Sequence, residues 1–197
     1  MAQIKLNMTY GATGTLPAVS GANLTSLTSG NLTGALPAIS GASLTSLTSK
    51  TDTYFCALMT VNQSVTNNTI TKVSLNNVEY DTLGSWDSTN LRWISTTTGK
   101  YFVYGMVNCY NGSASQMAIV STMIRKNGSN LFVSHLDFRN NYGGYYNGVG
   151  VGGIVNMGAT SDYIELWGYP YANSASSVGF RGNSSGVTTN LAIFRIS

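Results

Sequence analysis

The chain has 197 residues, of which only 9% are charged, and its formal net charge at pH 7 is +3. It contains no run of Lys or Arg, so the function classes that depend on contacts to nucleic-acid phosphates are excluded. A content of 43% hydrophobic and 11% aromatic residues excludes a disordered chain. No apolar stretch is long enough to span a bilayer, and Met1–Tyr10 lacks the apolar core of a secretory signal.

The first 51 residues contain a repeat. LPAVSGANLTSLTS at Leu16–Ser29 returns as LPAISGASLTSLTS at Leu36–Ser49, with two positions changed. A repeat of this size cannot bury its apolar side alone, so we expect it to pack against other copies as a trimeric shaft. A flexible linker rich in Ser, Thr and Gly is the alternative. The residues expected at the shaft axis are Leu16, Val19, Leu24, Leu27, Leu36, Ile39, Leu44 and Leu47.

From Tyr54 the chain changes to short runs of β-branched and aromatic residues, separated by Asn-Gly pairs at 111–112, 127–128 and 147–148. Asn127-Gly128, between two apolar runs, is the strongest hairpin signal. No window has a helical period, so the pattern predicts an all-β sandwich. Strands are expected at Tyr54–Val61, Thr69–Tyr80, Leu91–Ser95, Lys100–Tyr110, Gln116–Lys126, Asn130–Phe138, Val149–Met157, Asp162–Pro170, Ser176–Gly182 and Val187–Ser197.

Two of these runs, Lys100–Tyr110 and Val187–Ser197, are apolar on both faces. One face of a sandwich strand meets the opposite sheet, so the second face needs a cover. Another subunit is the expected cover, and Tyr101, Tyr104 and Phe194 are the predicted interface residues. The alternative covers are the chain's own loops or residues 1–50.

The region from Tyr54 to Ser197 resembles the globular head shared by complement subcomponent q and the tumour necrosis factor superfamily. The residues that carry this resemblance are Val78, Tyr80 and Asp81; Trp86, Asp87 and Thr89; Gly99, Tyr101 and Phe102; the Lys126–Gly128 hairpin; and Ser161–Leu166. The chain departs from the pattern at Thr96–Thr98, which lacks the usual Pro, and at Ser161, which replaces Gly. The resemblance implies a ten-stranded jelly roll that forms a homotrimer about a threefold axis.

The sequence therefore predicts two parts, an anchor or shaft at 1–51 and a jelly-roll knob at 52–197. A short repetitive shaft before such a knob is similar to bacteriophage fibres and capsid decoration proteins. This similarity implies a homotrimeric protein of the virion surface, a decoration protein or head fibre, assembled in the host cytoplasm. Other virion proteins are the expected partners of Met1–Gly14. The alternatives are a receptor-binding tail-fibre knob and a secreted complement-head-like binding module.

A ligand surface is predicted around the stretches Arg139–Gly153 and Tyr169–Ser177. Tyrosine combines a flat apolar ring with a hydroxyl, and neighbouring Asn and Gly adapt the hydrogen bonding, which suits a host glycan or protein surface. The alternative is that these rings only pack the knob. The candidate tyrosines are Tyr142, Tyr145, Tyr146, Tyr169 and Tyr171.

Catalytic motifs are missing from the sequence. His135 and Asp137 fall on one face of a predicted strand, but no nucleophile motif accompanies them, so we expect a structural pair and no enzyme activity. No metal or cofactor is expected, since Asp162 alone is a weak calcium ligand. Cys56 and Cys109 have no metal-ligand spacing and are predicted to be buried free thiols, since a disulfide needs an oxidising compartment.

Overall fold

The computed structural model describes residues 53–112, 116–140, 144–173, 177–186 and 188–196. The predicted shaft residues (Leu16, Val19, Leu24, Leu27, Leu36, Ile39, Leu44 and Leu47), the Met1–Gly14 docking segment and Tyr142 lie outside these ranges. The described residues form thirteen strands in two sheets, so the predicted all-β sandwich is confirmed. Five of the strands have only two or three residues, and the total exceeds the ten implied by the resemblance.

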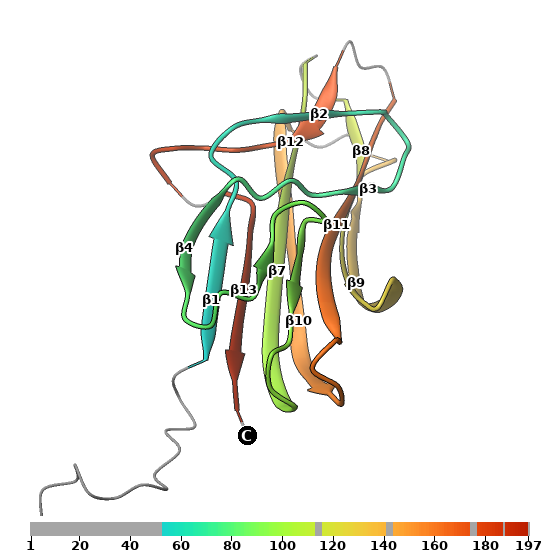
Figure 1. Cartoon of the computed structure of the whole chain (residues 1–197). Coiled ribbons are helices and arrows are strands. Elements are labelled where there is room, and N and C mark those ends of the chain that lie inside the picture. The colour runs from blue at the N-terminus through green and yellow to red at the C-terminus, as the bar shows by residue number, and fades with distance from the viewer. Residues whose placement is uncertain (1–52, 113–115, 141–143, 174–176, 187, 197) are drawn as a thin grey trace, which may run out of the picture. The chain divides into compact units, whose positions relative to one another are not determined.

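The first sheet, sheet A, is built around the long strand β7 (Figure 1). Antiparallel β10 pairs with β7 from Gly99 to Tyr110, while β13 and β12 share its other edge. Strands β1 and β4 extend the sheet beyond β13, and β2 pairs with β12. The bounds are β1 Tyr54–Leu58, β2 Gln63–Val65, β4 Asn77–Asp81, β7 Gly99–Asn111, β10 Tyr146–Met157, β12 Val178–Phe180 and β13 Asn190–Arg195.

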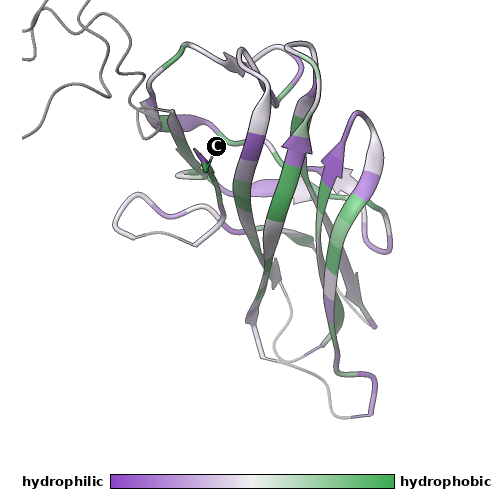
Figure 2. Cartoon of the chain, turned by 90° about the horizontal axis from the view of Figure 1, so that it is seen from below, coloured by the Kyte–Doolittle hydropathy of each residue, from purple (hydrophilic) through white to green (hydrophobic). Residues whose placement is uncertain are grey.

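The second sheet, sheet B, has the order β5-β6-β11-β8-β9, and β3 also pairs with β11. All of its pairings are antiparallel, and β9 forms one edge. The bounds are β3 Thr71–Lys72, β5 Trp86–Asp87, β6 Arg92–Ile94, β8 Met117–Lys126, β9 Ser129–Asp137 and β11 Tyr163–Ala172. Figure 2 shows hydrophobic stretches lying mainly along the long strands.

The core lies between the two sheets and follows the period-two alternation of the strands. Along β7, every second residue from Tyr101 to Cys109 is buried, so the predicted division of this strand into two faces is confirmed. The sheets pack tightly at Gly105, where an added Cβ would lie 2.6 Å from Leu166 Cδ1. Glycine is needed at this position because a side chain there would force the sheets apart.

The Asn127-Gly128 hairpin prediction is confirmed. Lys126 pairs with Ser129, and both turn residues have positive φ, 50° for Asn127 and 81° for Gly128. Two successive residues with positive φ give the type I′ turn that matches the twist of paired strands. The side chain of Asn127 also accepts a hydrogen bond from Tyr163 N at 2.9 Å, which ties the hairpin to β11.

Two local predictions were wrong. The pair at 147–148 was expected to separate strands, yet both residues lie inside β10, opposite Cys109 and Asn108. The long β7 edge supplies hydrogen-bond partners to this segment, and pairing overrides the local turn preference. The expected strand at 69–80 is divided into β3 and β4, which belong to different sheets.

Candidate functional site

The face of sheet A that points away from the core carries a row of large apolar side chains from four neighbouring strands. Tyr54, Phe194, Phe102 and Ile154 are aligned across β1, β13, β7 and β10. The rings of Phe102 and Phe194 have centroids 5.1 Å apart. Phe194 is 49% exposed and Ile154 is 62% exposed. We call this surface the sheet A outer face, defined by Tyr54, Tyr80, Phe102, Tyr104, Ile154 and Phe194.

Tyr104 shows how this outer face is shaped. Its ring lies against two glycines of β10. A Cβ added at Gly150 would meet the Tyr104 ring, and a Cβ added at Gly152 would lie 3.1 Å from the Tyr104 Cα. Tyr104 itself stays 37% exposed. Because Gly150 and Gly152 have no side chains, the Tyr104 ring can lie against the backbone of β10.

The structure corrects one of the three predicted interface residues, because Tyr101 belongs to the core. Its side chain is fully buried, its ring packs against Trp93 at a centroid distance of 5.2 Å, and its hydroxyl donates a hydrogen bond to Thr97 O. Successive side chains of a strand point to opposite faces, so Tyr101 cannot share a face with Tyr104. Tyr104 and Phe194 do lie on the outer face. Their role in an interface remains a prediction.

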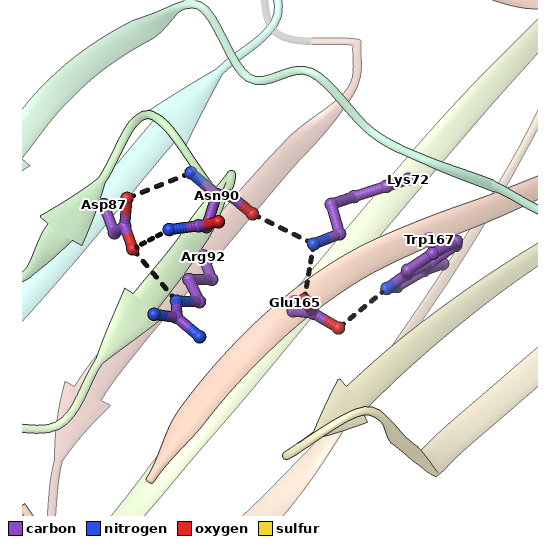
Figure 3. Close-up of polar contacts among 6 residues, drawn as sticks. All are labelled: Lys72, Asp87, Asn90, Arg92, Glu165 and Trp167. Atoms are coloured by element: carbon purple, nitrogen blue, oxygen red, sulfur yellow. Dashed lines mark hydrogen bonds and ion pairs between the residues drawn. The ribbon is translucent and has the colours of Figure 1, made fainter. Parts of the chain in front are cut away.

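On sheet B the outward side chains contact one another instead. Glu165 is buried, and its carboxylate accepts hydrogen bonds from Lys72 Nζ at 2.5 Å and from Trp167 Nε1 at 3.1 Å (Figure 3). Lys72 also donates to Asn90 O at 2.9 Å. The Arg125 guanidinium carbon lies 4.1 Å from the centroid of the Trp167 ring. This cluster satisfies a buried charge and fixes β3 against β11, which is a structural role.

A second carboxylate in Figure 3, Asp87, is held in the same way. It accepts hydrogen bonds from Asn90 and from Arg92 Nε, the latter at 3.0 Å. The hydrogen bond from Asn90, followed by the contribution of Arg92, lowers the pKa of Asp87 to about 2. The guanidinium carbon of Arg92 lies 4.7 Å from the centroid of the Tyr163 ring.

The predicted ligand tyrosines fall into two separate groups. Tyr145 and Tyr146 lie at the start of β10 in sheet A, with ring centroids 4.5 Å apart, and the Arg181 guanidinium carbon is 3.9 Å from the centroid of the Tyr146 ring. Tyr169 and Tyr171 point outward from β11 in sheet B. The sequence could not show this division, because it depends on which sheet each strand joins.

Next to the second group, the chain leaving β9 lines a pocket of about 560 Å³. The described lining residues are Asp137, Phe138, Arg139 and Asn140. Arg139 donates from its backbone N and from Nε and Nη2 to the Asp137 carboxylate. These hydrogen bonds lower the pKa of Asp137 to about 2. They also raise the pKa of Arg139, and Tyr171 and Tyr169 add a smaller part of that increase.

From the sequence, Arg139 was placed at the start of the candidate ligand stretch but was not paired with Asp137, which was assigned only to a pair with His135. The two side chains do lie on one face of β9, and His135 makes a smaller contribution to the low pKa of Asp137. Asp137 instead takes Arg139 as its main partner. A D-x-R spacing at a strand end, which lets the arginine fold back onto the carboxylate, is the signal that could have identified the pair.

The remaining polar candidates are structural. Asp162 accepts hydrogen bonds from Asn127, Gly158 N and Ala159 N, and it forms an ion pair with Lys126. The hydrogen bonds from Asn127 and Lys126 hold the pKa of Asp162 far below the usual range. Its oxygens are thus engaged. Among the described residues, no three His, Cys, Asp or Glu side chains are grouped to hold a metal ion, and no helix is long and apolar enough to cross a membrane.

Both cysteines are free thiols. Cys109 is buried as predicted, and burial raises the pKa of its thiol well above the usual range. Cys56 is only half-buried, so that part of the prediction was wrong. It alternates with inward-facing Phe55 and Ala57 on β1 and therefore points to the outward side of sheet A.

No family model and no curated protein matches the chain. Solved structures match the strand-rich region. Murine APRIL at pH 8.0 is 15% identical, with a TM-score of 0.52, over 73% of this chain and 98% of that chain. Eiger TNF from S. frugiperda is 8% identical, with a TM-score of 0.53, over 74% and 92%. The globular domain of zebrafish complement 1qA has a TM-score of 0.48 at 10% identity, over 74% and 98%. With the two-sheet topology, the first two matches show that the knob has a tumour necrosis factor-like jelly-roll fold.

Proposed function

We propose that this chain is a non-enzymatic homotrimeric binding module whose subunits associate through the sheet A outer face. The single observation that carries the proposal is the row of partly exposed large apolar side chains, three of them aromatic, across β1, β13, β7 and β10. An aromatic side chain contributes roughly 150–250 Å² of surface when it is buried. Soluble monomers rarely expose contiguous apolar patches larger than a few hundred Å². A face of this kind is typical of a subunit contact.

The proposed occupant of the face is a second copy of this chain. The resemblance to tumour necrosis factor and complement heads implies a threefold arrangement, and the fold matches that resemblance. In a closed threefold ring the contact is heterologous, so the sheet A outer face of each copy would be covered by a different patch of the next copy. A trimer also supplies the neighbours that the repeats at 16–29 and 36–49 need for packing.

We further propose that the trimer is displayed on a bacteriophage virion as a capsid decoration protein or head fibre. Support comes from the order of parts, a short repetitive segment followed by a jelly-roll knob. Residues 1–14 would then dock onto another virion protein. A receptor-binding tail-fibre knob, which attaches to the host, is the second candidate, and the pocket beside Arg139 favours it.

The solution mass of the purified chain tests the assembly. We expect about three times the 20.9 kDa of one chain by light scattering. A double variant, Tyr104→Glu with Phe194→Glu, should give folded monomers, because two charges would have to be buried in the contact. Circular dichroism checks that the variant keeps its strands. Ile70→Glu is the matched control, since Ile70 is similarly exposed but precedes β3 of sheet B. A monomeric wild-type chain would overturn the proposal.

The virion location is tested by electron microscopy of particles with antibody against the knob. Label distributed over the head is expected for a decoration protein. Label at the tail, with loss of adsorption in particles that lack the protein, would replace this role by the receptor-binding one. Label nowhere on the particle would contradict both.

A further inference from the structure

The outward face of sheet B brings three strands together next to the pocket. In the register of the sheet, Tyr171 lies opposite Ile119 of β8, and Ile119 lies opposite Asp137 of β9. Tyr169 is aligned in the same way with His135 through the intervening strand β8. Neighbouring strands are roughly 4.8 Å apart, so the tyrosines and the Asp137–Arg139 pair lie about two strand spacings apart. Arg139 is electrostatically coupled to both rings.

The two tyrosines are not equivalent in how they are held. The Tyr169 hydroxyl donates a hydrogen bond to Asn68 Oδ1, which fixes its position. Both rings are half-buried, so each has a packed edge and an accessible part. An immobilised, partly exposed aromatic ring suits stacking against the apolar C–H face of a ligand, because little rotamer freedom is lost on binding.

The Asp137–Arg139 pair offers both kinds of hydrogen-bonding group in a fixed geometry. Arg139 uses Nε and Nη2 toward the carboxylate, so the two N–H groups of Nη1 lie on the side of the guanidinium away from Asp137. The side chain of Arg139 is 63% exposed and that of Asp137 is 37% exposed. A ligand hydroxyl can accept from the guanidinium and donate to the carboxylate, which is the double role that a sugar hydroxyl performs.

The charge at the site decides the ligand class. Arg139 is neutralised by Asp137, so the pair has no net charge to attract a phosphate, sulfate or carboxylate group. A volume of about 560 Å³ falls in the size range of pockets for small ligands. We propose that the pocket formed by Asp137, Phe138, Arg139 and Asn140, with Tyr169 and Tyr171 beside it, binds a neutral sugar of one or two rings.

The site is independent of the proposed subunit contact, because it lies on sheet B and the contact lies on sheet A. This inference deepens the proposed binding role by naming a ligand, but the two can fail separately. A monomer that binds sugar would remove the trimer and leave the site, whereas a trimer without sugar affinity would do the reverse.

The test titrates the full chain with a panel of neutral hexoses, N-acetylhexosamines and their disaccharides, followed by calorimetry and by NMR of labelled protein. At least one sugar should bind, with Arg139 and Tyr171 signals shifting. Arg139→Ala and Asp137→Asn should each weaken that affinity about tenfold or more, because each removes a charge-assisted hydrogen bond. Tyr171→Phe should weaken it less than Tyr171→Ala, since the ring is retained.

Arg92→Ala is the matched control. Arg92 also forms a pair with an aspartate and lies over a tyrosine, Tyr163, but it belongs to β6, away from the pocket. Its loss should leave sugar affinity unchanged. Thermal unfolding of each variant confirms the fold. If no member of the panel binds detectably at up to about 50 mM sugar, the proposal is overturned. Affinity unaltered by Arg139→Ala, or tighter binding of sialylated or sulfated analogues, would overturn it as well.

Discussion

The outward faces of the two sheets differ in how their large side chains are engaged. On sheet A, the rings of Phe102 and Phe194 pack together, Phe194 and Ile154 stay largely exposed, and none of the three has a cation–π partner among the described residues. On sheet B, Trp167 lies between Lys72 and Arg125, and the carboxylate of Glu165 is fully occupied. The β11 side of sheet B is therefore satisfied within the chain, although Val133 of β9 stays 49% exposed, whereas the apolar row on sheet A gains free energy when a partner covers it. The comparison separates the surface that we propose for assembly from the surface that we propose for ligand binding.

The largest expected effect distinguishes two adjacent tyrosines of β7. Tyr101→Ala removes a fully buried ring and should lower the free energy of unfolding by about 3–5 kcal/mol, as in other large-to-small aromatic substitutions. Tyr104→Ala should lower the stability of an isolated monomer far less, and should act mainly on self-association. Urea unfolding of Tyr101→Ala, made in the monomeric Tyr104→Glu, Phe194→Glu background, measures the loss of stability. Light scattering of Tyr104→Ala measures the loss of self-association.

The control for this pair is Tyr101→Phe, which keeps the ring and loses only the hydrogen bond to Thr97. It should cost about 1 kcal/mol. If Tyr101→Ala instead gave a stable monomer, Tyr101 would be an interface residue after all, and the division of β7 into an inward and an outward side would fail.

The next effect tests whether sheet B is completed from within. Glu165→Gln leaves Lys72 without its carboxylate in a site where Lys72 is partly exposed, so a loss of about 1–3 kcal/mol is expected. Asp87→Asn, at a more exposed pair, should change stability less. Chemical denaturation of both variants provides the comparison. Equal effects would show that burial does not distinguish the two carboxylates.

A smaller effect concerns the Asn-Gly pairs, and it shows what local sequence can and cannot determine. Asn127→Ala should lower stability by about 1–2 kcal/mol, because it strains a positive φ and removes the hydrogen bonds to Asp162 and Tyr163. Asn147→Ala should cost less, since it loses one exposed hydrogen bond to Gly144 O. Thermal melts of the two variants test this order, and a reversed order would contradict the turn assignment.

These examples explain which predictions succeeded. The alternation along β7, the hairpin at 127–128 and the all-β class depend on local pattern, which the sequence contains in full. The sheet to which a strand belongs depends on long-range pairing, which no local signal encodes. That is why Tyr145 and Tyr171 were assigned to one surface, and why the turn expected at 147–148 is a strand. The choice of Tyr101 failed for a different reason, since the pattern identified two faces without showing which one points inward.

The smallest effect is a titration that compares two aspartates of sheet B. Asp137 and Asp87 both have a pKa of about 2, lowered chiefly by hydrogen bonds from Arg139 and Asn90 respectively. Because each pKa lies below the unfolded value of about 3.9, the stabilisation is present above pH 4 and is lost as the pH falls through about 2. NMR of the carboxyl carbons should give both midpoints.

Adding the bound sugar should lower the midpoint of Asp137 further, because a ligand that donates to the carboxylate favours its ionised form, and should leave Asp87 unchanged. Affinity should accordingly stay constant from pH 7 to about pH 4 and fall only below it. If the sugar shifted the titration midpoints of both aspartates equally, the sugar would act through the fold as a whole. The pocket would then not be the binding site.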